Sequence, residues 1–548
     1  MSSRKLNDGW EKIGDLKQLL AFGAKEYAER VAFVYQNVAD GKTTSVTYRE
    51  FEREVAQAAI GLLQILRIQT GTREGKKVAI LAPNSYDWAL AYLAIVNTQQ
   101  IVVPMDWQLP VTDLINLLKR ANVQAIIFGE EVTDKMIEIK KNFNKISQYI
   151  CLGKSEAMTM TWQKVKAVGR KNWTARKADY FEKKIYADTL STLIFTSGTT
   201  SLPKGIMLSH RTFMQSVLGM AHTFGMQAEI YLSLLPLYHI YEFECGLLLQ
   251  LLKGSTIYYL PGGVRKMTEN LQRVRPTWLF LVPLLVEGAW KRIEALAAEE
   301  KSHAALASAA KKYFGGRLKA FGSAGAALNP KVAEKFAEVG ITSLQGYGIS
   351  ENSACIAFNS KQHNKFASVG KPIATVKVKI GKINENGVGE IWVRGKTAML
   401  GYYKDEKKTD GVMEDGWLDT GDYGYFDEDG FLYVSGRKKN VIISKNAKNV
   451  YPEEIEFLLN NEEGIAESLV YGKVVTDDVE VAALIVPDNE KIAELHPNWS
   501  GIPDAKKIKN FLSKKIESVN QKNVPYKAIR DFQIVAGLPK TASGKMKR

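Results

Sequence analysis

Short apolar runs alternate with longer helical patterns along most of this chain. Residues 78–81 form a β-branched apolar run, and a helical pattern follows over 87–96. Strand–helix alternation predicts parallel or mixed sheets covered by helices, because a crossover helix returns the chain to the start of the next parallel strand. The predicted fold class is therefore α/β, with several mixed sheets flanked by helices. Further apolar runs continue the rhythm at 101–104, 125–128, 193–195, 255–260 and 278–282.

The chain of 548 residues is too long for one hydrophobic core, so at least two domains are expected. The pattern changes after Gly416, and a charged segment led by a glycine, 436–440, separates two predicted strands at 431–434 and 441–443. Such a break between strands is a candidate hinge. We predict a large N-terminal domain, a hinge and a small mobile α+β domain, at 1–436, 437–440 and 441–548.

Composition narrows the class of protein. The net charge is +15, from 74 basic and 59 acidic residues, and it would favour anionic ligands or weak association with an anionic membrane surface. No nucleic-acid-binding pattern is present, so a nucleic-acid partner is not expected. Three widely spaced cysteines and a charged start without an apolar core favour a cytoplasmic protein. The apolar stretch 231–252 contains two glutamates and predicts a buried helix after a turn, and 294–312 predicts a surface helix.

A run of hydroxyl side chains and glycines directly follows the predicted strand 193–195. Hydroxyls donate to phosphate oxygens, glycines let backbone N–H groups approach an anion, and lysine adds a positive charge. The run is not a Walker A loop, because its lysine precedes a glycine rather than Ser or Thr. It indicates a different polyphosphate-binding loop, made of Thr196, Ser197, Gly198, Thr199, Thr200, Ser201 and Lys204.

Other short segments carry groups that suit a nucleotide site. Glu351 follows Gly346-Tyr347-Gly348 and is a hard oxygen ligand suited to Mg²⁺. Asp422 ends an acidic, glycine-bounded turn and could accept ribose hydroxyls, to which Arg437 could also donate. His239 is expected in an apolar neighbourhood. Taken singly each segment has an ordinary structural interpretation as a core ring, a local cap or a buried histidine.

The order of these motifs resembles the adenylate-forming superfamily, which includes acyl- and aryl-CoA synthetases, adenylation domains of peptide synthetases and beetle luciferases. The resemblance implies ATP, Mg²⁺ and CoA as cofactors. It implies that Lys545, in the ending Thr541-Ala542-Ser543-Gly544-Lys545, bridges the substrate carboxylate and the α-phosphate. Lys439 matches the hinge position. The remaining implied roles are catalysis by Lys204, Thr199 and His239, metal binding by Glu351, phosphate binding by Thr196, Ser197, Gly198 and Thr200, adenine binding by Ser323, Ala324, Gly325, Gly346, Tyr347 and Gly348, and ribose binding by Asp422 and Arg437.

Within that superfamily, residues 443–456 look most like fatty acyl-CoA synthetases of medium or long chain, although Ala447 stands where glycine is usual. The stretch 232–236 lacks the acid that holds an amino group, so an amino-acid substrate is not expected. The acyl pocket is expected along 238–248 and 322–327. The predicted reaction makes acyl-AMP and then a CoA thioester. Alternatives are an acyl-AMP ligase that loads a carrier protein, an aryl or short-chain synthetase, a non-catalytic homologue and a basic binding scaffold; the oligomeric state is left open.

Overall fold

The computed structural model describes residues 9–36, 41–67, 75–154, 160–196, 203–297, 300, 302–443, 449–475, 478–499 and 504–539. Contacts divide the chain into two compact units. The first consists of Met1–Val378 and Val393–Leu418, and the second of Lys379–Trp392 and Asp419–Arg548. The hinge predicted at 437–440 concerns rotation rather than contact density, and it stays a prediction.

A seven-stranded sheet in the first unit confirms the strand–helix rhythm. Its order is β18-β8-β7-β4-β3-β5-β6, and the strands from β7 to β6 run parallel, while β8 and β18 are antiparallel additions at one edge. Its central strands are buried on both faces, which explains their continuous apolar runs. The strands are β3 (Lys77–Leu81), β4 (Ile101–Pro104), β5 (Ala125–Phe128), β6 (Gln148–Cys151), β7 (Leu190–Thr196), β8 (Lys204–Ser209) and β18 (Gly401–Tyr402).

Helices on this sheet differ in how much of their surface is buried. Two of them, α4 (Val111–Ala121) and α5 (Thr133–Asn142), contribute one apolar face to a core with β3, β4 and β5. By contrast α3 (Tyr86–Val96) is buried on every side, and its Tyr92 donates to or accepts from Thr192 of β7. A helix that is apolar all round belongs in a protein interior. Ser85 caps the start of α3 by accepting from the Trp88 amide.

A second, nine-stranded sheet is formed by described residues of the first unit, in the order β15-β14-β13-β12-β11-β9-β10-β1-β2. The strands β11, β12 and β13 are parallel neighbours, so their carboxyl ends share one edge. The N-terminal strand β1 pairs in parallel with β10 from the middle of the chain. The strands are β1 (Val31–Gln36), β2 (Thr43–Thr47), β9 (Ile230–Leu232), β10 (Thr256–Tyr259), β11 (Trp278–Leu281), β12 (Ala320–Ser323), β13 (Thr342–Tyr347), β14 (Ala357–Phe358) and β15 (Lys371–Pro372).

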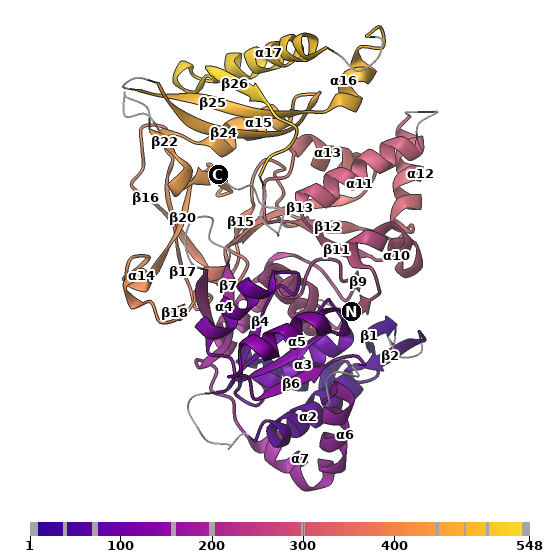
Figure 1. Ribbon diagram of the computed structural model, residues 1–548. Helices are drawn as coiled ribbons and strands as arrows, with labels where there is room; N and C mark the ends of the chain where they lie inside the picture. Colours follow the sequence, from indigo (N-terminus) through magenta and orange to yellow (C-terminus); the bar gives the residue numbers. More distant parts are fainter. Residues whose placement is uncertain are drawn as a thin grey trace. The chain divides into compact units, whose positions relative to one another are not determined.

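Four helices share one apolar cluster with β11 and β12. Figure 1 shows these helices in pink. The prediction of a single surface helix at 294–312 is wrong. Ser302 starts a new helix there by accepting from the Ala305 amide, so two helices share that stretch. The four are α10 (Met267–Val274), α11 (Pro283–Leu296), α12 (His303–Phe314) and α13 (Pro330–Glu338).

The apolar stretch 231–252 begins with the end of β9. A loop with the expected turn follows, in which the His239 amide donates to the Pro236 carbonyl over 3.0 Å. The π-helix η3 (Glu242–Leu248) comes next and continues as α9 (Leu249–Lys253). Every residue of η3 is buried, including both glutamates, which confirms the expected buried helix. In the described part of the chain, no helix is long and apolar enough to cross a bilayer.

The remaining elements of the first unit complete its surface. Two N-terminal helices, α1 (Leu16–Glu26) and α2 (Tyr48–Ile65), pack together, and α2 starts with a reciprocal cap between Thr47 and Glu50. Figure 1 shows α6 (Trp162–Lys171) beside α2. The others are η1 (Trp10–Lys12), η2 (Glu130–Val132), α7 (Trp173–Glu182), α8 (His210–Thr223), η4 (Gly263–Lys266), η5 (Ser350–Asn352), α14 (Glu406–Asp410) and β19 (Met413–Glu414).

The second unit contains the predicted small α+β arrangement. Strands β24, β25 and β26 form a sheet, and α15 and α17 share an apolar core with it; Figure 1 shows α17 along the sheet in yellow. Another sheet contains β16, β17 and β20 as successive neighbours, and β21 pairs with β20 off this path. The elements are β16 (Lys377–Gly381), β17 (Gly389–Arg394), β20 (Trp417–Phe426), β21 (Leu432–Arg437), η6 (Lys438–Asn440), β22 (Ile442–Ile443), β23 (Asn449–Val450), α15 (Pro452–Asn460), β24 (Ile465–Val475), β25 (Asp478–Pro487), α16 (Asn489–Leu495), α17 (Ala505–Gln521), η7 (Pro525–Lys527) and β26 (Asp531–Ile534).

Candidate active site

The predicted phosphate loop connects two antiparallel strands. Thr196 is the last residue of β7 and Lys204 is the first residue of β8, and the sheet register pairs them directly. The loop therefore starts at the carboxyl end of a strand that runs parallel to β4, which is where α/β sheets place ligands. The predicted residues Ser197, Gly198, Thr199 and Thr200 lie outside the described residues.

A buried tyrosine joins two of the predicted site residues. The hydroxyl of Tyr402 donates to Oε1 of Glu351 over 3.0 Å, and the Nζ atom of Lys204 lies 4.8 Å from the centre of the same ring. A lysine over an aromatic face is attracted by the ring's negative charge density. Lysine, tyrosine and glutamate thus form one cluster, although they come from three distant parts of the sequence.

Strand pairing places Tyr402 in this cluster. In β18, Tyr402 pairs with Ile206 and Gly401 with Met207 of β8, and the Tyr403 amide donates to the Gly205 carbonyl over 2.7 Å. The ring of Tyr402 is 5% exposed, so its hydroxyl requires a hydrogen-bond partner, which Glu351 supplies. Tyr402 was not predicted as a site residue from the sequence.

Glu351 lies in the short helix η5, directly after β13, and is half-buried. Its backbone carbonyl accepts from the Met399 amide over 2.8 Å, so the same segment that carries Tyr402 also holds the main chain of Glu351. Oε1 of the Glu351 side chain accepts the hydrogen bond from the Tyr402 hydroxyl. A carboxylate held in this way at one oxygen fits the predicted role of a Mg²⁺ ligand.

The two predicted adenine segments lie at one edge of the nine-stranded sheet. Ser323 ends β12 and Tyr347 ends β13, and the parallel register sets Ser323 opposite Gln345. Ser323 and Ala324 are buried, whereas Gly325 is exposed and Tyr347 half-buried. This edge presents a backbone and a ring where an aromatic base could stack.

Glycines at 346 and 348 are required by packing as well. A Cβ atom on Gly346 would lie 2.0 Å from the Phe358 ring, and one on Gly348 would lie 1.4 Å from the Ala354 carbonyl oxygen. Neither position can hold a larger residue without movement of its neighbours. Both glycines therefore have a structural role that would exist without a nucleotide.

The prediction that His239 lies in an apolar neighbourhood is wrong. Its neighbours Leu237 and Ile240 are buried, but His239 itself is exposed beside the ring of Tyr238. The residue lies in the loop between β9 and η3. An exposed imidazole next to a tyrosine can still meet a substrate, so its predicted catalytic role stays a prediction.

In the second unit, Asp422 and Arg437 are direct partners. They face each other across β20 and β21, and Nε of Arg437 donates to Oδ1 of Asp422 over 3.0 Å. Asp422 is 2% exposed, whereas the Arg437 side chain is 46% exposed. The sequence predicted that both contact a ribose; the structure adds that the arginine also neutralises and orients the buried acid.

Lys439 lies in η6, the short helix between β21 and β22, and is exposed. The predicted charged break between two strands is therefore present. Its neighbour Lys438 is anchored instead, with Nζ 2.7 Å from Oε1 of Glu390 and 2.9 Å from Oδ2 of Asp419. Lys545 and the predicted CoA-side segment 444–448 lie outside the described residues.

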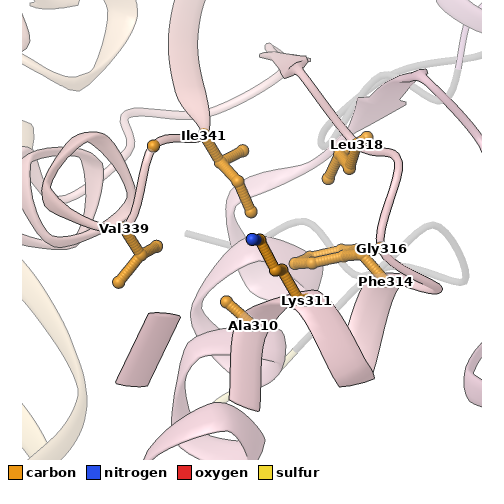
Figure 2. A pocket seen from close by; sticks show the side chains of 8 residues that line it. Ala310, Lys311, Phe314, Gly316, Leu318, Val339 and Ile341 are labelled. Carbon is orange, nitrogen blue, oxygen red and sulfur yellow. The ribbon is translucent and has the colours of Figure 1, made fainter. Parts of the chain in front are cut away.

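The pocket in Figure 2 is separate from these groups. It lies between α12 and the start of β13, and Lys311 extends among the apolar side chains of Phe314, Leu318 and Ile341. No predicted site residue lines it. In the described ranges, no group of three or more His, Cys, Asp or Glu side chains could hold a metal by itself. A Mg²⁺ ion at Glu351 would therefore need further ligands from a nucleotide or water.

Comparison with protein families matches residues 20–403 to the family described as AMP-binding enzyme. The chain belongs to this family. The match covers well over half of the chain and includes both strands of the phosphate loop, Glu351 and Tyr402. The predicted family, the fold class and the enzyme class, an AMP-forming ligase, are confirmed.

Curated relatives of this AMP-binding enzyme are similar over most of their length. "Long-chain-fatty-acid--CoA ligase FadD15" from Mycobacterium bovis is 26% identical over 502 residues, covering 83% of this chain and 80% of the relative. "4-coumarate--CoA ligase-like 2" from Arabidopsis thaliana is 26% identical over 551 residues, covering 97% and 92%. Two relatives with different named acids thus match at the same identity.

A solved structure has the same fold. The O-succinylbenzoate coenzyme A synthetase MenE from Bacillus subtilis, in complex with ATP and a magnesium ion, superposes with a TM-score of 0.73 at 21% identity and covers 97% of this chain and 98% of that chain. The predicted large N-terminal and smaller C-terminal parts agree with this architecture. ATP and Mg²⁺ are cofactors that suit the family and the Lys204–Glu351 cluster.

Proposed function

We propose that this AMP-binding enzyme uses ATP to activate a carboxylic acid as acyl-AMP, with release of pyrophosphate, and then transfers the acyl group to the thiol of CoA with release of AMP. The observation that carries the proposal is the cluster in which Tyr402 joins Lys204, at the end of the phosphate loop, to Glu351. The tyrosine thus brings together a positive charge and a carboxylate suited to a metal ion, and this combination suits the binding of a polyphosphate.

The chemistry explains why such groups are needed. A carboxylate is a poor acyl donor, and its attack on the α-phosphorus brings two anions together. In the proposal, Lys204, Thr196, Ser197, Gly198, Thr199 and Thr200 hold the phosphates, and Lys545 aligns the carboxylate with the α-phosphate. Magnesium bound at Glu351 would neutralise phosphate charge. Ser323, Ala324, Gly325, Gly346, Tyr347 and Gly348 would hold adenine, and Asp422 with Arg437 the ribose.

We propose a medium- or long-chain fatty acid as the substrate. Support comes from the similarity to the mycobacterial long-chain ligase and from the apolar side chains of η3 and α9, where Leu247, Leu248 and Leu249 are fully buried. An apolar tunnel stabilises each added methylene by about 0.8 kcal/mol. The coumarate-ligase-like relative of equal identity supports an aryl acid as the second candidate.

The test is a series of kcat/KM measurements over saturated acids of increasing length, with aryl acids alongside and CoA as the acceptor. A fatty acid substrate predicts that kcat/KM rises with length until the tunnel ends. A maximum at acetate or at an aryl acid would reject the fatty acid assignment. Turnover with an acyl carrier protein but not with CoA would reject CoA as the acceptor.

Weak peripheral association with an anionic bilayer is a further part of the proposal, and the net charge of +15 supports it. Sedimentation with phosphatidylserine vesicles at low salt should decrease steeply as salt is raised, because exposed charges are screened. Equal sedimentation with phosphatidylcholine vesicles would contradict an electrostatic origin.

A further inference from the structure

Glu244 is a fully buried carboxyl group for which the proposed reaction has no use. It lies in the π-helix η3, a rare element that is often found at functional sites. Two residues earlier, Glu242 is equally buried, but its two oxygens accept from Tyr231 and Ser233 over 2.8 and 2.6 Å. By hydrogen-bond geometry Oε1 of Glu244 has no partner among the described residues, although the Ser353 hydroxyl lies close enough to lower the pKa of the acid. The two acids therefore differ in their surroundings.

The remaining oxygen of Glu244 contacts a serine with a second partner. Oγ of Ser216, on α8, is within hydrogen-bond distance of Oε2 of Glu244 and lies 2.6 Å from the backbone carbonyl oxygen of Ser353. A hydroxyl has one proton, and a carbonyl can only accept. Ser216 must therefore donate to Ser353, and the contact between Ser216 and Glu244 requires a proton on the glutamate.

The surroundings agree with a neutral glutamic acid. Burial raises the pKa of Glu244 well above its ordinary value. The titratable groups that interact with it are Tyr92 from α3, Cys245 from η3 and Cys355 from the segment before β14, and none of these is a cation. An unpaired carboxylate in such a place would cost far more than a neutral carboxyl group with one unpaired oxygen.

The carbonyl that Ser216 holds belongs to a strained turn directly after the metal-ligand candidate. Ser353 and Ala354 both have positive φ angles, +51° and +60°, although neither is glycine. Such residues persist only where the surroundings hold them. Neighbouring bonds add to this hold, since Thr397 donates to Asn352 over 2.9 Å and the Cys355 amide donates to the Ser353 carbonyl over 2.8 Å.

We propose that Glu244 is a protonated positioning residue that fixes Glu351 through Ser216 and Ser353. The carboxylic acid donates to Ser216, Ser216 donates to the Ser353 carbonyl, and the turn so held sets the direction of η5 and of the Glu351 carboxylate. The consequence for Mg²⁺ rests on the proposed function, whereas the hydrogen-bond chain itself does not.

Four variants test this chain of bonds. Ser216→Ala removes the middle link, and Glu244→Leu removes the first donor at similar volume. Glu244→Gln keeps a neutral donor, because its amide N–H can replace the acid O–H. Ser191→Ala is the matched control, since Ser191 is equally buried and donates to the Leu208 carbonyl over 3.1 Å, away from Glu351.

The first measurement is hydrogen–deuterium exchange of the unliganded protein in peptides that cover 347–357. Ser216→Ala and Glu244→Leu should speed exchange there by about tenfold, and Glu244→Gln and Ser191→Ala by no more than about twofold. Slow exchange in Ser216→Ala, or fast exchange in Glu244→Gln equal to that in Glu244→Leu, would overturn the proposal.

The second measurement is the Mg²⁺ dependence of acid-dependent pyrophosphate exchange. The half-saturating Mg²⁺ concentration should rise about five- to tenfold in Ser216→Ala and Glu244→Leu and return near the wild-type value in Glu244→Gln. An unchanged Mg²⁺ requirement in all variants would reject the link to Glu351. A wild-type enzyme without any pyrophosphate exchange would reject the proposed function instead, and the deuterium exchange would still decide the hydrogen-bond chain.

Discussion

The hydroxyl of Tyr402 lies 3.0 Å from Oε1 of Glu351, and the face of the same ring lies 4.8 Å from Nζ of Lys204. Separate substitutions distinguish these contacts. Tyr402→Phe keeps the ring but removes the hydrogen bond, so the half-saturating Mg²⁺ concentration should rise by about threefold to tenfold. Tyr402→Leu also removes the lysine contact, worth about 0.5–1 kcal/mol, and should raise KM for ATP as well.

Titrations of ATP and Mg²⁺ in a pyrophosphate-exchange assay measure both effects. Tyr403→Phe is the matched control, because its ring lies near Lys77 and Lys404 and not near Glu351. Identical kinetics for the Phe and Leu variants at position 402 would show that the ring makes no separate contribution.

Asp422→Ala should weaken the binding of ATP, because the variant loses a contact with the ribose. The wild-type enzyme should prefer ATP to its 3′-deoxy analogue, and the variant should lose that preference because the acceptor for the hydroxyl is gone. KM for the acid should change little. The check is a comparison of kcat/KM for the two nucleotides with each enzyme; a preserved preference in the variant would place the ribose elsewhere.

Lys545→Ala should affect one half-reaction. Activation of the free acid should fall by orders of magnitude, because the charge that aligns carboxylate and α-phosphate is lost. Transfer from supplied acyl-AMP to CoA should continue at a similar rate. Single-turnover assays of each step measure this, and an equal loss in both steps would contradict a role limited to activation.

Lys439→Pro tests the hinge. Proline fixes φ, so rotation at η6 should be blocked and the thioester step should slow far more than activation. Lys438 is not a suitable control site, because its bonds to Glu390 and Asp419 would be lost too. Lys439→Ala serves as the control, since it removes the charge and leaves φ free. If both half-reactions survive in the proline variant, the hinge lies at another position.

His210 should make the protein less stable as the pH falls. Burial lowers its pKa to about 4, so the folded protein keeps it neutral while the unfolded chain protonates it below its ordinary value near 6.5. Its contribution is therefore complete above that value and is lost as the pH falls towards 4. Between about pH 7.5 and about pH 5 the loss is about 2 kcal/mol.

Urea unfolding of wild type and His210→Gln at both pH values measures the contribution of His210 as a difference. Burial raises the pKa of Glu242 to about 8, which acts in the opposite direction, but that effect is common to both proteins and cancels. His303→Gln, at an exposed position, is the control. A constant difference in unfolding free energy between wild type and His210→Gln would exclude His210 as the titrating group.

The sequence predicted the elements whose signal is local. The strands at 78–81, 101–104 and 125–128 could be predicted because their sequences are continuously apolar. The structure explains this pattern, since these strands are buried on both faces. The start of a new helix at Ser302 was missed because alanine-rich segments on both sides favour helix, although a serine before His303 is an ordinary cap signal.

The site was predicted in its motifs but not in its connections. Tyr402 reaches Glu351 because a strand of only two residues pairs with β8, about two hundred positions earlier in the chain, and no local pattern encodes such pairing. The direct pairing of Asp422 with Arg437 likewise depends on the register of β20 and β21. The exposure of His239 was mispredicted because apolar neighbours in sequence do not determine which side of a loop a residue faces.

The parallel pairing of β1 with β10 has a consequence for synthesis on the ribosome. Phe33 lies opposite Ile257, and the Thr256 hydroxyl donates to the Val31 carbonyl over 2.7 Å. More than two hundred further residues must therefore be synthesised before β10 leaves the exit tunnel and can pair with β1. The strands β3, β4 and β5 can associate much earlier. During that interval Ala32 and Phe33 of β1, which are fully buried in the folded protein, are exposed to chaperones and proteases, so translation speed across 37–255 should influence the yield of folded enzyme.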